Sequence, residues 1–267
     1  MDLRIAILGA GVMGETLLSA FLRAGVRPDQ VAVSEKVTER AAELTARHGV
    51  TVTDTTTAVD GADLVLVAVK PQDVAAVLDE IGPLVAPGAT VLSVAAGVRI
   101  ATFETALAAG VGVVRAMPNT PALIGEGMFG ISPNATVSPE RLAQVETLLR
   151  AGGEVVVVDE AHQDAVTAVS GSGPAYVFYL AEAMIAGGVD AGLDPETARR
   201  LATQTVLGAA RLLAESDEPA DELRRRVTSP NGTTHAAVTS FDEHEVSAGI
   251  RAGMAACAAR SAELSGS

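Results

Sequence analysis

The stretch "LRIAILGAGVMGETLLSAFLRAG", residues 3–25, decides the fold of the N-terminal half of the chain. It opens with an apolar run, residues 3–8, of the kind found in a strand buried on both faces of a parallel sheet. Three glycines follow in the spacing G-x-G-x-x-G, at Gly9, Gly11 and Gly14, and a helical pattern comes next. A strand, a glycine turn and a helix in this order are typical of a dinucleotide-binding site.

Each of the three glycines has a separate task in such a site. Gly9 permits the tight turn, Gly11 lets the backbone approach a pyrophosphate, and Gly14 allows the helix to pack closely on the strand. The helix N-terminus then offers unpaired N–H groups to the phosphates. We therefore predict cofactor contacts from the loop residues Leu8, Gly9, Ala10, Gly11, Val12 and Met13.

Strand and helix patterns alternate beyond this first unit. Apolar runs recur at 31–33, 64–69, 90–94, 111–115 and 154–158, and helical patterns separate them at 37–47, 72–80, 100–108 and 139–150. Strands that alternate with helices pair in parallel through right-handed crossovers. The fold class predicted is α/β, with a doubly wound (Rossmann) parallel sheet domain over residues 1–160.

The remaining segment, residues 161–267, is predicted to be all-helical, because it contains no convincing strand. Its helical stretches are 161–169, 174–191, 195–215, 219–227 and 234–263. The 174–191 stretch is apolar nearly all round, and such a helix must be enclosed on every side. We infer that a second copy of the chain supplies part of the cover. The segment is therefore predicted to be a dimerisation domain of a homodimer, and assembly into a larger oligomer such as a decamer stays open.

Composition excludes several classes of partner. The 267 residues carry a net charge of −14, which argues against nucleic acid and anionic membrane surfaces as partners. A single cysteine, Cys257, rules out an intramolecular disulfide. The most apolar long run, residues 174–193, contains Glu182 and Asp190, which favours a buried helix over a membrane span. The N-terminus shows no secretion signal, so we expect a cytoplasmic protein, and we assign no metal site.

The end of the second strand is where a dinucleotide fold reads the 2′ position of the adenosine ribose. In "VSEKVTER", residues 33–40, Glu35 could accept a hydrogen bond from a free ribose hydroxyl, as in NAD sites. Ser34, Lys36 and Arg40 could instead hold a 2′-phosphate. Three donors against one acid favour NADPH and leave NADH open. A solvated charge cluster at a helix start is the alternative.

Further cofactor contacts are expected where other strands end, because ligands of open α/β sheets lie at the carboxyl edge. The stretches "AVKP" (68–71), "VAAGV" (94–98) and "RAMPNTPALIGEG" (115–127) follow three strands. A strand cap and a plain crossover loop are the alternatives for the first and the last of them. The predicted contacts there, together with one at Thr55, are Ala68, Val69, Lys70, Pro71, Ala95, Ala96, Gly97 and Asn119.

Taken together, six stretches resemble the pyrroline-5-carboxylate reductase family, which makes proline from its cyclic imine. They are "GAGVMG", "AVKPQ", "RAMPNTPA", "DAVTAVSGSGPAYVF", "GLDPETARRLATQTVLGAA" and "VTSPNGTT", and they extend over nearly the whole chain. The last three are specific in combination, whereas the first is shared by many dehydrogenases. The resemblance implies reduction of a cyclic imino acid by NAD(P)H.

The resemblance also implies that the turn 229–234 binds the substrate. The Ser229 hydroxyl and the amides of Gly232 and Thr233 would hold the ring carboxylate, and Thr234 would hydrogen-bond the ring nitrogen as the catalytic residue. The family places this turn near the cofactor domain of the same or the partner subunit, at a dimer interface. Unpaired amides at a helix start are consistent with this role. A helix cap with nothing bound is the alternative.

The chain departs from the family pattern twice. Asn231 stands in the substrate turn where glycine is usual, and Glu245-Val246 replaces a usual Gly-Phe between the last helices. Asparagine tolerates a positive φ, so the turn can form, but its side chain can re-aim the pocket.

Two rival functions are weighed against imine reduction. A β-hydroxyacid dehydrogenase uses a lysine of its second domain, but this chain has no lysine after Lys70. A catalytically silent NADP-binding regulatory protein draws modest support from Asn231.

Overall fold

A computed structural model of the chain describes residues 3–266 and divides into two compact units. Unit 1 runs to Ser172 and resumes at Cys257, whereas unit 2 is Gly173–Ala256 between them. The sequence-based division after residue 160 lies earlier, because the helical segment that follows the last strand still packs on the sheet. The side chain of Gln163 in that segment donates to the Gly130 carbonyl at 3.1 Å.

The sheet of unit 1 has eight strands in the order β3-β2-β1-β4-β5-β6-β7-β8. Strands β1 to β6 pair in parallel, in the strand order of a doubly wound dinucleotide fold. The predicted fold class is confirmed. The strands are β1 (Ile5–Leu8), β2 (Val31–Ser34), β3 (Thr51–Thr53), β4 (Leu64–Val67), β5 (Thr90–Ser93), β6 (Gly112–Met117), β7 (Gly127–Pro133) and β8 (Gly153–Val157).

The last two strands depart from the expected all-parallel pairing. β7 runs antiparallel to β6, with Ala116 opposite Ile131, and β8 then pairs in parallel with β7. The sequence prediction was wrong here because the segment "GMFGISP" contains two glycines and lacks a clear strand pattern. A short connection from β6 reaches an antiparallel neighbour directly, without the crossover helix that a parallel neighbour needs.

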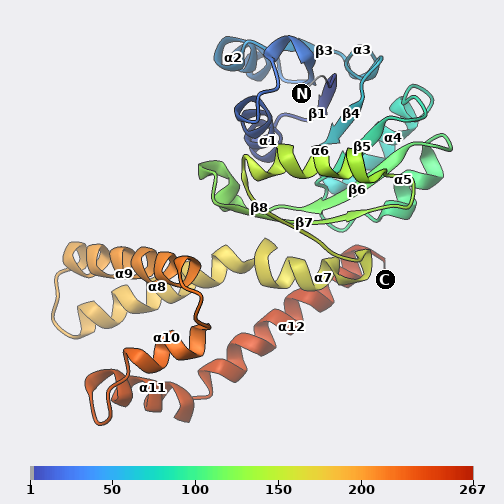
Figure 1. Ribbon diagram of the computed structural model, residues 1–267. Helices are drawn as coiled ribbons and strands as arrows, with labels where there is room; N and C mark the ends of the chain where they lie inside the picture. Colours follow the sequence, from blue (N-terminus) through green and yellow to red (C-terminus); the bar gives the residue numbers. More distant parts are fainter. Residues whose placement is uncertain (1–2, 267) are drawn as a thin grey trace. The chain divides into compact units, whose positions relative to one another are not determined.

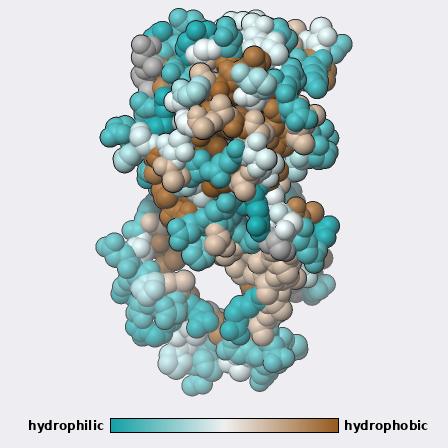
Figure 2. Space-filling model, turned by 90° about the vertical axis from the view of Figure 1, so that its right-hand side faces the viewer, coloured by the Kyte–Doolittle hydropathy of each residue, from teal (hydrophilic) through white to brown (hydrophobic). Residues whose placement is uncertain are grey.

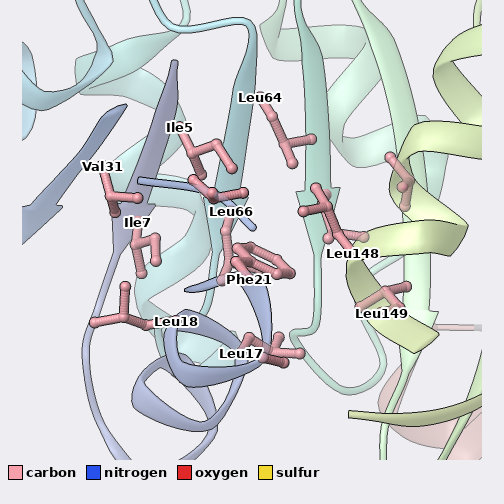
Figure 3. Close-up of a cluster of buried hydrophobic side chains, with 14 of the residues drawn as sticks. Ile5, Ile7, Leu17, Leu18, Phe21, Val31, Leu64, Leu66, Leu148 and Leu149 are labelled. Carbon is pink, nitrogen blue, oxygen red and sulfur yellow. The ribbon is translucent and has the colours of Figure 1, made fainter. Parts of the chain in front are cut away.

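Two apolar layers hold helices on both faces of the sheet (Figure 1). Leu17 and Phe21 of α1 and Leu148 of α6 pack against Ile7 and Leu66 of the sheet, as Figure 3 shows. The opposite layer includes side chains of α3, α4 and α5. The helices of the first layer are α1 (Val12–Arg23), α2 (Thr38–His48) and α6 (Pro139–Arg150), and those of the second are α3 (Thr55–Val59), α4 (Val74–Ile81) and α5 (Ile100–Ala106).

The end of the C-terminal helix also belongs to unit 1. Ser261, near the end of α12 (Val246–Leu264), donates to Asp164 of α7 (Gln163–Val166) at 2.6 Å between the oxygens. Cys257 lies 3.3 Å from the Ser172 hydroxyl, and the thiol is free. A Cβ at Gly97 would lie 3.3 Å from the Leu264 carbonyl oxygen, so this helix end contacts the loop after β5.

Unit 2 is helical and leaves much apolar surface exposed. Its helices are α8 (Gly173–Asp190), α9 (Pro195–Glu215), α10 (Ala220–Arg226), α11 (Thr233–Glu243) and the first part of α12. No residue of α8 is buried within the described chain. Exposed side chains include Phe178, Tyr179 and Leu201, and the lower part of Figure 2 shows apolar and polar side chains side by side.

The expected continuous helix 234–263 is in fact two helices. α11 ends at Glu243 and α12 begins at Val246, with Glu245 between them at φ 54°. A left-handed residue ends a helix, and glutamate gives no sequence signal for it. Among residues 3–266, none of the helices combines the length and apolarity that a bilayer span requires.

Candidate functional site

The glycine-rich loop between β1 and α1 has the geometry that its spacing predicts. Gly9 has φ 88°, and a Cβ there would lie 3.1 Å from the Ala68 carbonyl group. A Cβ at Gly14 would lie 2.1 Å from the Gly9 carbonyl oxygen. Gly14 is therefore required by space, because a side chain would collide with the loop backbone, whereas Gly9 is required by its positive φ and has only tight space for a Cβ.

Gly11 differs from the other two because it is exposed. A Cβ at Gly11 would meet no atom within 4 Å, and no side chain caps the start of α1 there. The backbone is thus open to a ligand at the point where the helix amides are unpaired. These features fit the pyrophosphate of a dinucleotide.

Three loops meet beside this glycine turn at the carboxyl edge of the sheet. The Ala68 amide donates to the Leu8 carbonyl at 2.9 Å, and the Val94 amide donates to the Val67 carbonyl at 3.1 Å. The loops after β1, β4 and β5 therefore lie side by side. The predicted contacts Val12, Met13, Val69, Lys70, Pro71, Ala95, Ala96 and Gly97 all lie on these loops or on the helices that they open, with Lys70 and Ala96 exposed and Ala95 buried.

Ser34 and Thr55 form a pair at the ends of β2 and β3. Their hydroxyl oxygens are 3.0 Å apart, and both residues are at least nine-tenths buried. The Gly9 amide also donates to the Ser34 carbonyl at 3.1 Å. Ser34 thus supports the glycine turn through its backbone, while Lys36 is exposed two residues further on.

Glu35 and Arg40 both contact the glycine turn at Ala10. One Glu35 carboxylate oxygen accepts from the Ala10 amide at 3.3 Å, and the other accepts from the Val37 amide at 2.9 Å. The Arg40 guanidinium donates to the Ala10 carbonyl from Nε and Nη2, each at 3.3 Å. Acid and base therefore line the same pocket of about 730 Å³ beside the start of α1.

Sequence reasoning missed a group of residues in that pocket. Glu15, in the first turn of α1, accepts hydrogen bonds from Arg40 and from Arg47 at 2.7 Å, and its carboxylate lies 2.8 Å from His48 Nε2. Burial raises the pKa of Glu15, but hydrogen bonds from His48, Arg40 and Arg47 outweigh it and lower the pKa to about 2. The carboxylate is therefore an ion throughout the physiological pH range.

The sequence pattern indicates only part of this cluster. Arg40, Arg47 and His48 share α2, but their common partner Glu15 lies on α1, separated from them by 25 or more residues. Nothing in the local pattern pairs these two helices.

Asn119 lies in the loop after β6, at the start of the 3₁₀ helix η3 (Thr120–Ile124). Its side-chain oxygen accepts from the Met128 amide at 2.9 Å, and its side-chain nitrogen donates to the Ser170 carbonyl at 3.1 Å. The side chain joins this loop to β7 and to the π-helical segment η5 (Thr167–Gly171). These hydrogen bonds give Asn119 a supporting role, and its predicted contact with the cofactor stays a prediction.

The predicted substrate turn lies in unit 2, at the start of α11. Asn231 has φ 60°, the left-handed conformation in which glycine is usual, and the Gly232 amide donates to the Ser229 carbonyl at 3.0 Å. A Cβ at Gly232 would lie 2.4 Å from the Ser229 hydroxyl oxygen. Gly232 caps α11 without a side-chain hydrogen bond, so the amides of Thr233 and Thr234 head the helix unpaired.

Comparison with known proteins finds similarity over nearly the whole chain. Residues 160–264 match the family model for pyrroline-5-carboxylate reductase dimerisation, and residues 4–97 match the model for coenzyme F420-dependent NADP oxidoreductases. A pyrroline-5-carboxylate reductase of Corynebacterium melassecola is 43% identical over 264 residues, which cover 97% of this chain and 98% of that protein. The chain belongs to the pyrroline-5-carboxylate reductase family.

Solved structures agree with this family membership. A pyrroline-5-carboxylate reductase of Coxiella burnetii matches with a TM-score of 0.95 and 33% identity, covering 99% of both chains. A Plasmodium falciparum pyrroline carboxylate reductase with NADP bound matches with a TM-score of 0.87 and 25% identity over 99% of this chain and 98% of that one. The two-part architecture, sheet unit and helical unit, is therefore that of the reductase family.

Proposed function

We propose that the chain reduces 1-pyrroline-5-carboxylate to proline with NAD(P)H. The observation that carries this proposal is identity of 43% to a reductase over nearly the full length of both proteins. A glycine turn with room for a pyrophosphate at Gly11 supports the coenzyme class independently. The reaction would be the last step in making proline.

The first part of the proposal concerns the coenzyme, which supplies a hydride when it is bound in its reduced form. Gly9, Ala10 and Gly11 would face the pyrophosphate, with the unpaired amides of α1 as donors. Glu35 and Arg40 would face the adenosine ribose. The small residues Ala95 and Ala96 would leave room for a flat ring beside the loop after β5.

The second part concerns the imino acid and assigns it to the turn 229–234. The Ser229 hydroxyl and the Thr233 amide would hold the carboxylate, and the Gly232 amide would join them on leaving the Ser229 carbonyl to which it donates in the single chain. Each hydrogen bond to a charged group contributes about 1.5–3 kcal/mol. Thr234 would hydrogen-bond the ring nitrogen and so fix the orientation of the C=N bond. A protonated imine is already electrophilic, so orientation is the main task that remains for the protein. Asn231 would border the pocket and narrow it.

The third part concerns assembly. We propose a homodimer in which a second copy covers the apolar surface of unit 2, because a helix as apolar as α8 is normally enclosed. Phe178 and Tyr179 are 62% and 76% exposed in the single chain. Further assembly, as in a decamer, would use other surfaces. The cytoplasmic location stays a prediction from the sequence.

Coenzyme oxidation tests the proposal directly. Loss of NADPH or NADH absorbance is followed with purified protein, with and without the cyclic imine, and proline is identified in the product. Oxidation that needs the imine and yields proline is expected. Tight coenzyme binding without any such oxidation would instead identify a silent binding protein, and oxidation of 3-hydroxy acids would point to the β-hydroxyacid dehydrogenases.

A further inference from the structure

The pocket beside the glycine turn contains a carboxylate that faces the cations of α2. Glu15 lies in the first turn of α1, and its side chain is 16% exposed. It is paired with Arg40, Arg47 and His48, all of which line the same pocket. Two of the three arginines that line the pocket are thus already bound to an anion of the protein, whereas the third, Arg23, donates to the Ala151 carbonyl.

Each of the three nitrogens of the Arg40 guanidinium donates to at least one protein oxygen. Nε and Nη2 donate to the Ala10 carbonyl, Nη2 also donates to Glu15, and Nη1 donates to Glu43 at 3.1 Å. A guanidinium has five N–H groups, so a phosphate that binds Arg40 through two of them must displace one of these acceptors. Glu15 stays ionised at neutral pH, because its pKa is lowered to about 2 by its three partners.

Glu35 gives the same pocket an acceptor for a ribose hydroxyl. Its carboxylate is held by the amides of Ala10 and Val37, at the end of β2 where dinucleotide folds read the 2′ position. An acid at this place suits a free hydroxyl, whereas a 2′-phosphate needs a free cation. Lys36 is exposed beside Glu35 and would supply one cation, whereas Arg40 would supply a second only after it had left Glu15.

We propose that Glu15 determines coenzyme specificity by holding Arg40 and Arg47, so that the pocket gives little preference to a 2′-phosphate over a 2′-hydroxyl. Glu15 acts through the arginines and is a specificity-determining residue rather than a catalytic one. This inference rests on the proposed use of a nicotinamide dinucleotide, but it does not depend on which substrate is reduced.

The test uses two fragments that differ only in the 2′-phosphate, namely 2′,5′-ADP and 5′-AMP, with binding measured by calorimetry. The wild-type protein is expected to bind the two with dissociation constants within ~3-fold of each other. Glu15→Gln keeps the side-chain shape and removes the charge. This variant is expected to lower the dissociation constant of 2′,5′-ADP by ~10-fold, which corresponds to ~1.4 kcal/mol. The dissociation constant of 5′-AMP should stay within ~2-fold of the wild-type value.

Two further variants localise the effect. Glu43→Gln also removes an acceptor of Arg40, but Glu43 is 57% exposed, so the ratio of the two constants is expected to change by less than ~2-fold. In the double variant Glu15→Gln/Arg40→Ala most of the gain for 2′,5′-ADP is expected to vanish, because only the Arg47 guanidinium, 59% exposed, is then freed.

Several results would overturn the inference. If Glu15→Gln changed the dissociation constants of both fragments equally, the role of Glu15 would be structural only. If it weakened the binding of 2′,5′-ADP, Glu15 would orient the arginines toward the phosphate. A wild-type preference for 2′,5′-ADP above ~10-fold would refute it without any variant. Failure of the proposed reductase activity would leave these binding ratios unchanged, so the two failures are distinguishable.

Discussion

The glycine turn before α1 and the Ser-Pro-Asn-Gly turn before α11 have similar backbone conformations. They differ in how closely other atoms pack around the residue at positive φ. Each contains a residue at positive φ, Gly9 at 88° and Asn231 at 60°, and each leaves helix amides unpaired. Around Gly9 the backbone of Ala68 is so close that a Cβ would lie 3.1 Å from it. Asn231, by contrast, carries a side chain.

The difference separates two reasons for a glycine. At Gly9 the dihedral angle requires glycine and the space for a Cβ is tight, so no other residue fits without movement. At Asn231 only the dihedral angle is demanding, and asparagine meets it at a modest cost in free energy. Position 9 in unit 1 is therefore constrained by packing as well as by its dihedral angle, whereas position 231 in unit 2 is open to variation in its side chain.

The largest expected effect comes from Gly14→Ala in the first turn. The new methyl group would lie 2.1 Å from the Gly9 carbonyl oxygen, so the loop must move. We expect a loss of ~3 kcal/mol or more in unfolding free energy, a fall in Tm of ~6–12 °C and dinucleotide binding weakened by more than ~10-fold. Gly11→Ala is the matched control, since its Cβ has open space and should leave Tm within ~2 °C. Equal Tm values for the two variants would contradict the packing constraint.

The next effect concerns catalysis by the second turn. Thr234→Ala should lower kcat/KM for the cyclic imine by ~10- to 150-fold, because a hydrogen bond to the reacting group is lost. The KM for the coenzyme should stay within ~2-fold. Thr233→Ala is the control, since Thr233 is proposed to act through its amide, and its kcat/KM should stay within ~3-fold. Steady-state kinetics with both substrates measures these values, and full activity in Thr234→Ala would remove the proposed role of its hydroxyl.

An effect of intermediate size is expected in the pH dependence of stability, which should distinguish the two turns. Of the two turns, only the first is followed by a largely shielded, multiply paired acid, Glu15, whose pKa is lowered to about 2. A lowered pKa stabilises the folded state above the ordinary value near 4.5, and this stabilisation is lost as the pH falls toward 2. The free energy of unfolding, measured with urea, should therefore fall more between pH 5 and pH 3 in the wild type than in Glu15→Gln. Parallel pH profiles would show that Glu15 is not a stabilising ion.

The smallest effect is expected at Asn231. Asn231→Gly should change the free energy of unfolding by less than ~1 kcal/mol, while Asn231→Ala should lower it by ~1 kcal/mol, because alanine is poorer at positive φ. The reverse exchange, Gly9→Asn, should cost ~1–3 kcal/mol because the space is filled. Urea denaturation of all three variants decides whether packing truly separates the two turns. Similar costs at both positions would erase the distinction.

The sequence predicted most of this architecture because its signals are local. The apolar run at 3–8 and the three glycines after it sufficed for the first strand, the turn and α1. Helices such as α6 and α9 were predicted with the bounds that the structure shows, since Pro139 and Pro195 mark where they begin. Most of the parallel part of the sheet and the helical character of the following segment were therefore predictable without any tertiary information.

Other features depend on contacts that no local pattern encodes. β3 and α3 were missed because "TVT" and "TTTAV" are short and rich in threonine. The antiparallel direction of β7 is a property of its pairing with β6, and the cluster at Glu15 joins two helices distant in sequence. The break at Glu245 was indicated only by the family resemblance, because a glutamate gives no local signal for a left-handed residue.

The return of α12 to unit 1 has a consequence for the order in which the protein matures on the ribosome. Leu264 reaches the loop at Gly97, and Ser261 reaches Asp164, but both follow unit 2 in the chain. Translation at about 5–20 residues per second must therefore pass through unit 2, for several seconds, before unit 1 receives its final contacts. A cell thus never holds a finished nucleotide-binding unit whose helical unit has not yet been translated.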